Sequence, residues 1–327
     1  MILILSDKND VHADTVEEKL IKQNQPVYRF NLDVESLKST HISFNEDVWT
    51  IKQSGITIDS NSVQVVWFRR AFVELLLEEK DSREADFLIW KNEWNKILLG
   101  FYLSISSKPC LCPLKQSYAA ENKFLQYSIS KDVGLIMPDY LTSNDKDLLI
   151  EFCHLKNNNT VLKLHHQDFY NINGAYQGLY VNKIFENQLN EFSVMGENPI
   201  TLQEYIDKKY EVRYTVVGER HFCCKIDSQR SELAKIDWRR YDLPNTPHCR
   251  FDAPIDIKTK ISTLMKKLDI NYGALDFIVD QNDNWFFLEI NPMGQWLWIE
   301  DLTGLEISNA ICDWLISNRN QTEEVKI

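Results

Sequence analysis

Glycine is scarce in this chain, which has 10 glycines in 327 residues, less than half of the usual share of roughly 7%. The loops that cradle phosphate groups in Walker and Rossmann nucleotide sites are rich in glycine, because their backbone must approach the phosphates closely. No segment has the glycine spacing of either loop. The sequence therefore excludes these two common designs for a nucleotide site.

Long apolar runs and an excess of basic charge are also missing. The longest apolar run, residues 97–105, is far shorter than the roughly 20 residues that span a bilayer. The apolar start at residues 1–5 is short and lacks a basic flank, so we expect no signal peptide. The 36 basic and 48 acidic residues give a net charge of −12, which argues against a nucleic-acid partner. We expect a cytoplasmic protein that binds neither nucleic acid nor a membrane.

The seven cysteines follow no metal-binding pattern. Their number is odd and they form no Cys-x-x-Cys pairs, so a zinc site has no support. Reduced thiols are the usual state in the cytosol. We therefore expect the adjacent Cys223 and Cys224 to serve packing and not redox chemistry.

Strand-like and helix-like segments alternate from the start of the chain, which predicts an α/β fold. Residues 2–5, 27–30 and 63–68 are typical of strands, and residues 83–103 carry apolar side chains at helical spacing. A helix is expected at residues 119–132. The expected units are an N-terminal α/β domain, a central unit and a C-terminal unit, covering residues 1–117, 118–198 and 199–327.

Two strands near the C-terminus, residues 274–279 and 285–290, flank a short polar loop and predict a hairpin. If Asp280 pairs with Trp285, Asp276 lies directly opposite Glu289. One face of this hairpin would be wholly apolar and would have to face a core. That face would hold Leu275, Phe277, Val279, Phe286, Leu288 and Ile290.

The other face of the expected hairpin carries Asp276, Glu289 and Asn291. Two carboxylates directly opposite each other destabilise a sheet unless a positive charge lies nearby. A hard cation, Mg²⁺ or Mn²⁺, fits ligands that offer only oxygen atoms. A Lys or Arg partner, or simple exposure to solvent, is the alternative, and the hairpin pattern does not decide between them.

Several basic residues are candidates for contacts with anions. Lys163 interrupts an apolar strand, so it either extends to solvent at a sheet edge or faces an anion. Arg213 and Glu211 are two residues apart, so they share one face of the expected strand. Lys225 would lie across from Arg213 on the next strand if the turn at Gly218 had three residues. Lys123, taken alone, is an ordinary surface residue of a helix. For each, the simple alternative is a surface ion pair of little energetic value.

The order of these features resembles the ATP-grasp superfamily over essentially the whole chain, and more closely its microviridin-type, or graspetide, peptide maturases. The resemblance rests on residues 208–218, on Asp-Trp-Arg-Arg at 237–240 and on residues 289–298. The Gly-Gln-Trp-Leu-Trp run at 294–298 is fairly specific to that branch. Residues 1–11 are similar to the start of its grasp-with-spasm subgroup.

This resemblance implies an N-terminal pre-ATP-grasp domain, with ATP held between the central and C-terminal units. It implies contacts of Lys123 and Lys163 with the phosphates and of Glu211 with the ribose. It implies that Glu204, Tyr205 and Ile206 form a hinge whose main-chain groups pair with the edge of the adenine. Gln203 would belong to the same ATP-binding stretch. It also implies Mg²⁺, or Mn²⁺, bound by Asp276, Glu289 and Asn291.

The resemblance further implies a reaction. An Asp or Glu side chain of a ribosomally made precursor peptide would attack the γ-phosphorus of ATP and become an acyl phosphate. A Ser or Thr hydroxyl, or a Lys amine, of the same peptide would then displace phosphate and close an ω-ester or ω-amide ring. The candidate catalytic residues are Arg213, to hold the acyl phosphate, Arg239 and Arg240, to hold the acidic core peptide, and Lys225.

The resembled family also implies two kinds of partner. The leader of the precursor peptide would bind the central unit near the polar stretch 167–178, which is typical of a hairpin tip or a mobile loop, and the enzyme would be a homodimer. The nearest alternative is an ATP-grasp carboxylate–amine ligase that joins a free amino acid to a peptide or small acid. An ATP-binding regulator without catalysis and a simple peptide-binding module are further alternatives.

Overall fold

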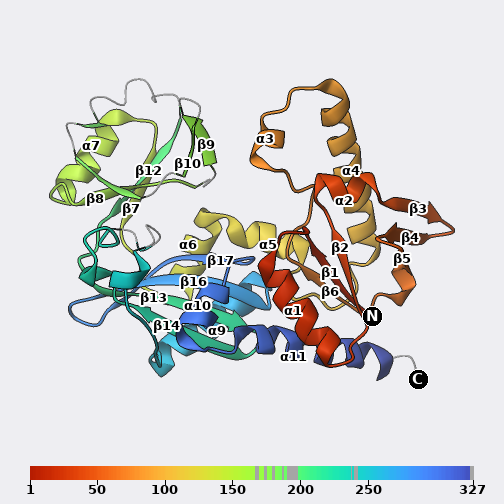
Figure 1. Ribbon diagram of the computed structural model, residues 1–327. Helices are drawn as coiled ribbons and strands as arrows, with labels where there is room; N and C mark the ends of the chain where they lie inside the picture. Colours follow the sequence, from red (N-terminus) through yellow and green to blue (C-terminus); the bar gives the residue numbers. More distant parts are fainter. Residues whose placement is uncertain are drawn as a thin grey trace.

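The computed structural model (Figure 1) describes residues 1–165, 169–172, 175–178, 181–185, 188–189, 198–236, 238 and 242–324. These residues form a mixed α/β structure with five sheets. No helix among them combines the length and the apolar character needed to cross a membrane.

The N-terminal unit is built on a parallel sheet with the strand order β2-β1-β6. Its strands are β1 (Ile2–Ser6), β2 (Val27–Asn31) and β6 (Val65–Phe68). All residues of β1 are buried, as expected for the central strand of a parallel sheet covered on both faces. Helix α1 (Val11–Lys22) follows β1, and the Asp10 side chain caps it by accepting from the backbone of His12 and Ala13.

An antiparallel sheet of three strands extends the N-terminal unit. It consists of β3 (His41–Asn45), β4 (Val48–Gln53) and β5 (Ile56–Asp59), in that order. The sequence analysis did not predict these strands, although apolar and polar residues alternate in the short, largely exposed strands β3 and β5. The helical elements here are α2 (Val34–Lys38), η1 (Ser60–Ser62), α3 (Leu77–Lys80) and α4 (Ala85–Ser104).

The middle of the chain forms an antiparallel sheet with the order β11-β8-β12-β7. Helix α7 (Lys146–Leu155) packs on it through Leu149 and Cys153. Strands β9 (Phe169–Ile172) and β10 (Ala175–Gly178) pair antiparallel as a separate sheet, which fits the hairpin alternative and not the loop alternative of the sequence analysis. The strands of the sheet are β7 (Tyr140–Ser143), β8 (Thr160–Lys163), β11 (Asn182–Ile184) and β12 (Ile200–Glu204).

The last part of the chain forms a five-stranded antiparallel sheet with the order β15-β14-β13-β16-β17. Helix α9 (Ile255–Leu268) packs on one face, and α10 (Leu297–Thr303) and α11 (Ile307–Glu324) follow the last strand. Short 3-10 helices lie at Ser228–Arg230 and Leu243–Asn245. The strands are β13 (Lys208–Val217), β14 (Arg220–Ile226), β15 (His248–Arg250), β16 (Tyr272–Asp280) and β17 (Trp285–Asn291).

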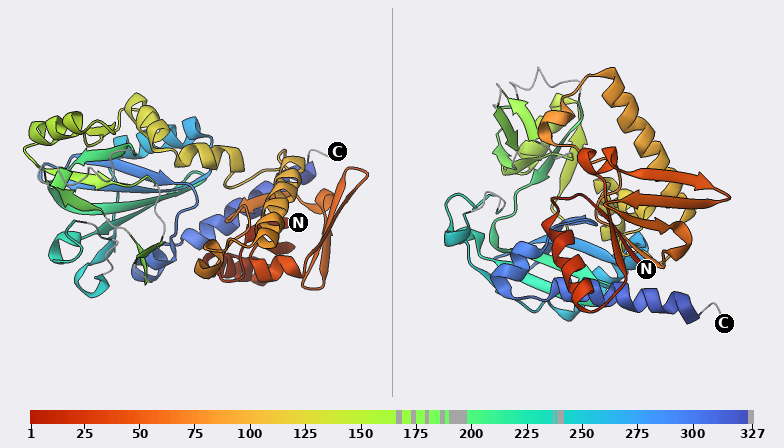
Figure 2. Two further views of the ribbon diagram at one scale, coloured as in Figure 1. Left: turned by 90° about the horizontal axis from the view of Figure 1, so that it is seen from above. Right: turned by 45° about the vertical axis from the view of Figure 1, so that its right-hand side comes forward.

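The N-terminal unit and the C-terminal sheet share one hydrophobic core. Ile4 of β1 and Val16 and Leu20 of α1 belong to the same buried cluster as Ile311 and Leu315 of α11. Helix α11 passes beside α1 along the N-terminal unit (Figure 2). The two ends of the chain are therefore held together by burial of apolar surface.

The single helix expected at residues 119–132 is in fact two helices, α5 (Leu114–Glu121) and α6 (Lys123–Asp132). Asn122 has an extended backbone, and its side chain accepts from the backbone of Leu125. Asparagine is a favoured N-cap residue, so it starts a new helix where the periodicity alone predicts continuation. As a result, Lys123 lies in the first turn of α6.

The β16–β17 hairpin has the expected pairing at one end only. Asp276 lies opposite Glu289, as expected, but Val279 pairs with Trp285 and Phe277 with Phe287. The extra residue is on β17, where Leu288 has no partner opposite the step from Asp276 to Phe277, and this bulge accounts for the change of register. On β17 the expected core face is correct at Ile290 but wrong beyond the bulge, where Trp285 and Phe287 lie in the core in place of Phe286 and Leu288.

The turn at Gly218 gives a test of backbone strain. Gly218 and Gly55 both have positive φ, but an added Cβ would lie 2.9 Å from Trp314 at Gly218 and would meet nothing within 4 Å at Gly55. We expect Gly55→Ala to cost about 1 kcal/mol, the backbone penalty alone. Gly218→Ala should cost about 1–3 kcal/mol more. Urea denaturation of both variants checks this, and equal losses would show that the Trp314 contact is unimportant.

The buried His12 gives a test of pH dependence. Burial and the positive charges of Arg69 and Arg70, opposed by Asp10, lower the pKa of His12 to about 4. A lowered pKa means that the unfolded chain binds this proton first, so stability is lost as the pH falls from about 6.5 towards 4. We expect Tm to fall less over this range in His12→Gln than in the unmodified chain. The exposed His41 is the control, because His41→Gln should leave the pH dependence of Tm unchanged.

Candidate active site

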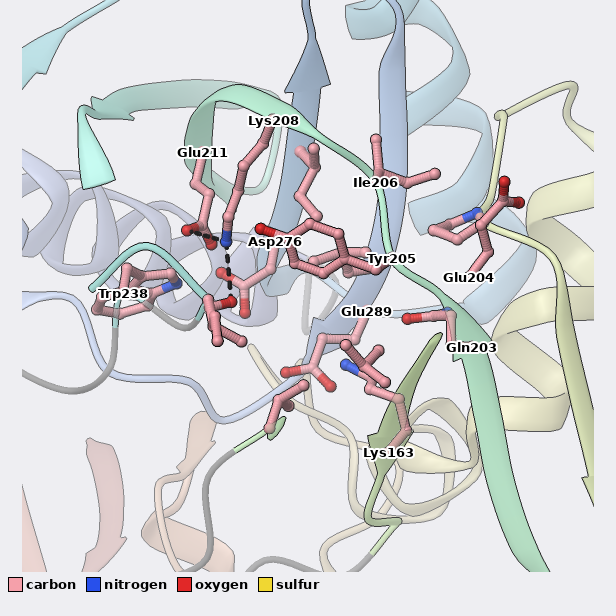
Figure 3. Close-up of a pocket in the computed structure, with 16 residues that line it drawn as sticks. Lys163, Gln203, Glu204, Tyr205, Ile206, Lys208, Glu211, Trp238, Asp276 and Glu289 are labelled. Carbon is pink, nitrogen blue, oxygen red and sulfur yellow. Dashed lines mark hydrogen bonds and ion pairs between the residues drawn. The ribbon is translucent and has the colours of Figure 1, made fainter. Parts of the chain in front are cut away.

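Two cavities meet at the β16–β17 hairpin, and Asp276 and Glu289 line both of them. The first cavity lies between the four-stranded and five-stranded sheets (Figure 3). Its polar wall includes Lys163 from β8, Lys208 and Glu211 from β13 and the segment 203–206 at the end of β12. Ile278, Leu288 and Trp238 add apolar surface. The bulge in β17 thus turns the side chain of Leu288 towards this cavity and away from the core.

The second cavity lies between the five-stranded sheet and the N-terminal unit. The sheet contributes Arg213 and Asn291 in addition to the two shared carboxylates. The opposite wall carries side chains from the segment that follows β6 and from α5, namely Arg69, Arg70, Phe72, Glu74, Tyr118 and Glu121. The hairpin carboxylates therefore form a boundary between a cavity on the side of the central sheet and a cavity on the side of the N-terminal unit.

Positive charges balance the two facing carboxylates. Arg213 donates from Nη1 to both oxygens of Asp276, at 2.9 and 3.0 Å. Lys123 Nζ lies 2.9 Å from Glu289, a contact made possible by its place in the first turn of α6. Burial alone would lower the pKa of Arg213, but the charge of Asp276 and its hydrogen bonds raise it above the ordinary value. Basic partners of the kind that the sequence analysis considered are therefore present at both carboxylates.

A second buried ion pair borders the first cavity. Lys208 Nζ lies 2.6 Å from Glu211 Oε1 and also donates to the Ile236 carbonyl at 2.9 Å. The Ser228 hydroxyl donates to the same Glu211 oxygen at 2.8 Å. Lys208 and Glu211 are three residues apart, so they share a face only because the pairing of β13 with β16 is irregular between Lys208 and Tyr210.

The structure brings most of the expected site residues to the two cavities. Lys163, Gln203, Glu204, Tyr205, Ile206 and Glu211 line the first, Arg213 and Asn291 line the second, and Asp276 and Glu289 line both. Lys123 reaches the site through Glu289. Glu204 also forms an ion pair with Lys156 at 3.4 Å. The expected Arg239 and Arg240 lie outside the described residues.

Lys225 is not placed where the sequence suggested. The turn at Gly218 has two residues, because Val217 pairs with Arg220. Lys225 therefore lies opposite Val212, and Cys224 lies opposite Arg213. Side chains alternate between the faces of a sheet, so Lys225 is on the face away from Arg213, with its ammonium 4.5 Å from the centre of the Tyr210 ring. The predicted site role for Lys225 is wrong in this arrangement.

Three basic residues that line the cavities were not predicted. Lys208 was missed because strict alternation places it on the other face from Glu211. Arg69 and Arg70 follow β6 and reach the second cavity only through contact between the N-terminal and C-terminal parts of the chain. Nothing in their local sequence marks them out.

The candidate metal ligands are two carboxylates and one amide. Among the described residues, no group of three or more His, Cys, Asp and Glu side chains is arranged to hold a metal ion. The expected set of Asp276, Glu289 and Asn291 is not such a group, because its third member is an asparagine. Asn291 Nδ2 donates to Glu289 Oε1 at 3.3 Å, so these two side chains are in contact.

Known proteins share this arrangement of domains. Residues 1–117 match the family model described as the MvdD pre-ATP grasp domain. A RiPP-associated ATP-grasp ligase from Chryseobacterium gregarium, solved with ADP and a leader and core peptide, is 28% identical; the match covers 97% of this chain and 96% of that chain, with a TM-score of 0.86. The macrocyclase MdnC from Microcystis aeruginosa MRC, bound to the precursor peptide MdnA, is 26% identical over 97% of this chain and 99% of that chain, with a TM-score of 0.85.

Over nearly its whole length the chain is thus similar to RiPP-associated ATP-grasp ligases. This confirms the resemblance and the fold class inferred from the sequence. The macrocyclase MdnB from the same Microcystis strain agrees, with 28% identity, 96% and 98% coverage and a TM-score of 0.79.

More distant curated relatives of this ATP-grasp chain are pyruvate carboxylases. Those of Aspergillus niger and Aspergillus terreus are 24% identical over 142 residues, which is 38% of this chain. The chain spans about a tenth of the length of these relatives, since the match covers 11% of each.

The Arg213–Asp276 pair gives a test of this charge arrangement. Both side chains are less than a tenth exposed, and removing one partner of a buried pair costs about 3–5 kcal/mol. We expect a loss of this size for Arg213→Met in urea denaturation. The matched control is Lys225→Met on the other face of the sheet, which should cost about 1 kcal/mol or less. Equal losses would contradict the separation of the two faces.

Proposed function

We propose that the chain is an ATP-dependent ligase that activates side-chain carboxylates of a precursor peptide and condenses them with nucleophiles of the same peptide. One observation carries this proposal: paired carboxylates with two cationic partners lie at the boundary between two cavities. One cavity can then hold the nucleotide and the other the peptide, with the reacting groups meeting between them. The similarity to ligases solved with precursor peptides supports the same assignment.

The residues of the first cavity fit ATP. Lys163 supplies a positive charge for phosphate, and Glu211 supplies carboxylate oxygens for ribose hydroxyls. Gln203 Nε2 is buried and has no hydrogen-bond partner among the described residues. An unmet buried donor costs about 1–3 kcal/mol, so a ligand acceptor at this position is favourable. We assign the adenine edge to the segment 203–206.

The donor set at the boundary fits a hard cation. Asp276, Glu289 and Asn291 all offer oxygen atoms, which Mg²⁺ prefers and Mn²⁺ accepts. Asp276 and Glu289 are already neutralised by Arg213 and Lys123, so a cation would share or replace those partners. When bound, Mg²⁺ and ATP supply the phosphoryl group and neutralise the charge that develops on it.

In this proposal, the chain's own residues position the peptide and hold charge. Arg213 holds phosphate oxygens of the activated carboxyl group with its planar fork, and Lys123 and Lys163 hold the phosphate groups. The activated carboxyl is sensitive to water, so the cavity walls must exclude water until the second side chain attacks. That attack forms a carbon–oxygen or carbon–nitrogen bond, breaks the bond to phosphate and releases inorganic phosphate.

The finer features of the reaction are part of the same proposal. Attack by a Ser or Thr hydroxyl gives an ω-ester, and attack by a Lys amine gives an ω-amide. The peptide core would lie in the second cavity, and the leader would bind the central sheet near β9 and β10. Arg239 and Arg240 would contact the acidic core.

Two further predictions concern the organisation of the protein. Two copies of the chain would form a homodimer. The unit boundaries at residues 117 and 198 likewise stay a prediction.

Intact-mass analysis of a co-produced precursor peptide tests the proposed activity. The peptide from the neighbouring open reading frame is the substrate to use. We expect the loss of one water for each link, and mild alkali should open esters but leave amides intact. An unchanged peptide, together with ATP hydrolysis that needs a free amino acid, would support the carboxylate–amine ligase in its place.

The metal ligands are tested by variants of one hairpin. We expect Asp276→Asn and Glu289→Gln to lower peptide-dependent ATP turnover by at least about 100-fold, because charge stabilisation at the phosphoryl group is lost. Asp283, at the exposed tip of the same hairpin, is paired with Lys209 and provides the control. Asp283→Asn should keep full turnover. Normal turnover in either of the first two variants would refute the ligand set.

A further inference from the structure

The loop that follows Asn291 is held by donors from two different parts of the molecule. Its carbonyl groups at positions 292–295 each accept a hydrogen bond from another side chain. Cys112 Sγ donates to Pro292 at 3.2 Å, Arg69 Nη1 donates to Met293, Tyr272 Oη donates to Gly294 at 2.8 Å, and Arg213 Nη2 donates to Gln295 at 3.2 Å. We call residues 292–295 the carbonyl loop.

The carbonyl loop is packed against the proposed site. A Cβ added at Gly294 would lie 2.6 Å from Ala274 Cβ, 3.0 Å from Arg213 Nη2 and 3.2 Å from Asn291 Cβ. The Gly294 backbone also donates to the Asn291 carbonyl at 3.1 Å. A displacement of the loop would therefore move Asn291, and it would weaken one of the hydrogen bonds that orient Arg213.

Arg69 is the ionic link between this loop and the N-terminal sheet. Its side chain is 2% exposed, and its Nε lies 3.1 Å from Asp10 Oδ2. Asp10 is itself fixed, because it caps α1 and accepts from the Ser6 hydroxyl at 3.1 Å. The Arg69 guanidinium also lies 5.6 Å from the ring centre of Trp296, next to the loop. One buried side chain thus connects the start of α1 to the backbone beside Asn291.

We propose that Arg69 is a positioning residue for the metal-binding end of the site. By holding the Met293 carbonyl, it fixes the carbonyl loop so that Asn291 and Arg213 keep their places beside Asp276 and Glu289. This inference rests on the proposed function, because it assigns Asn291 to the cation. It gives the N-terminal unit a part in the geometry of the site, in addition to lining the peptide cavity.

The alternative is that Arg69 only stabilises the fold, and a matched arginine separates the two. Arg29 of β2 is also buried, with a side chain 8% exposed. It pairs with Asp14 and donates to the Asp7 carbonyl, but it makes no contact with the carbonyl loop. Arg29→Met and Arg69→Met both remove a buried, ion-paired arginine from the N-terminal unit. Both should lower Tm, and only Arg69→Met should disturb the loop.

Hydrogen–deuterium exchange of the ligand-free protein is the first measurement. We expect faster exchange of backbone amides in a peptide covering residues 291–299 in Arg69→Met, and no change there in Arg29→Met. If Arg69→Met does not fold, Arg69→Lys replaces it. Lysine keeps the charge beside Asp10 but lacks the planar fork that reaches Asp10 and Met293 together. Equal exchange in both arginine variants, or no increase in the Arg69 variant, would overturn the proposal.

The Mg²⁺ requirement for ADP binding is the second measurement, followed by tryptophan fluorescence. Loss of a residue that orients a metal ligand typically weakens metal affinity about 10–100-fold. We expect the Mg²⁺ concentration for half-maximal ADP binding to rise about 10-fold in Arg69→Met and to stay unchanged in Arg29→Met. An unchanged requirement in Arg69→Met would overturn the proposal while leaving the proposed function intact. Failure of the unmodified chain to bind ADP with Mg²⁺ would overturn both.

Discussion

The placement of Asp276 opposite Glu289 is the constraint on which the site depends. Two buried carboxylates on neighbouring strands repel each other and must be neutralised. The protein brings Arg213 from the adjacent strand and Lys123 from a helix of a different unit to do so. The register of β13 with β16 places Arg213 opposite Asp276. The N-cap at Asn122 places Lys123 in the first turn of α6, within reach of Glu289. Because both carboxylates already have a cationic partner, a metal ion proposed to bind them would have to share or replace Arg213 and Lys123.

The sequence was sufficient for the elements that depend on local pattern. The alternation in β16 and β17 predicted the Asp276–Glu289 pairing correctly, and the order of motifs identified the superfamily. The same alternation failed beyond the bulge, where one extra residue turned Leu288 towards the cavity and Phe287 into the core. A bulge leaves no periodic signal, since both Phe286 and Leu288 are as apolar as the residues that replaced them.

Other failures had equally local causes. The turn at Gly218 is one residue shorter than the alternative considered, and this placed Lys225 on the opposite face of the sheet. Arg69 was missed for a different reason: its partners, Asp10 and Met293, are far from it in the sequence and meet only when the first and last parts of the chain share a core. Long-range contacts of this kind cannot be read from composition or periodicity.

The carbonyl loop has a consequence for attempts to re-engineer the protein. The N-terminal unit is an attractive part to exchange, because it lines the cavity proposed for the peptide. In this chain, however, Cys112 and Arg69 hold two carbonyls of the C-terminal part, so the two parts are fitted to each other at the level of single hydrogen bonds. A chimera that brings a foreign N-terminal unit would need these two donors, and the aspartate that orients the arginine, to be transplanted with it. An exchange that cuts the chain only at the end of the N-terminal unit would therefore separate the carbonyl loop from the donors that hold it.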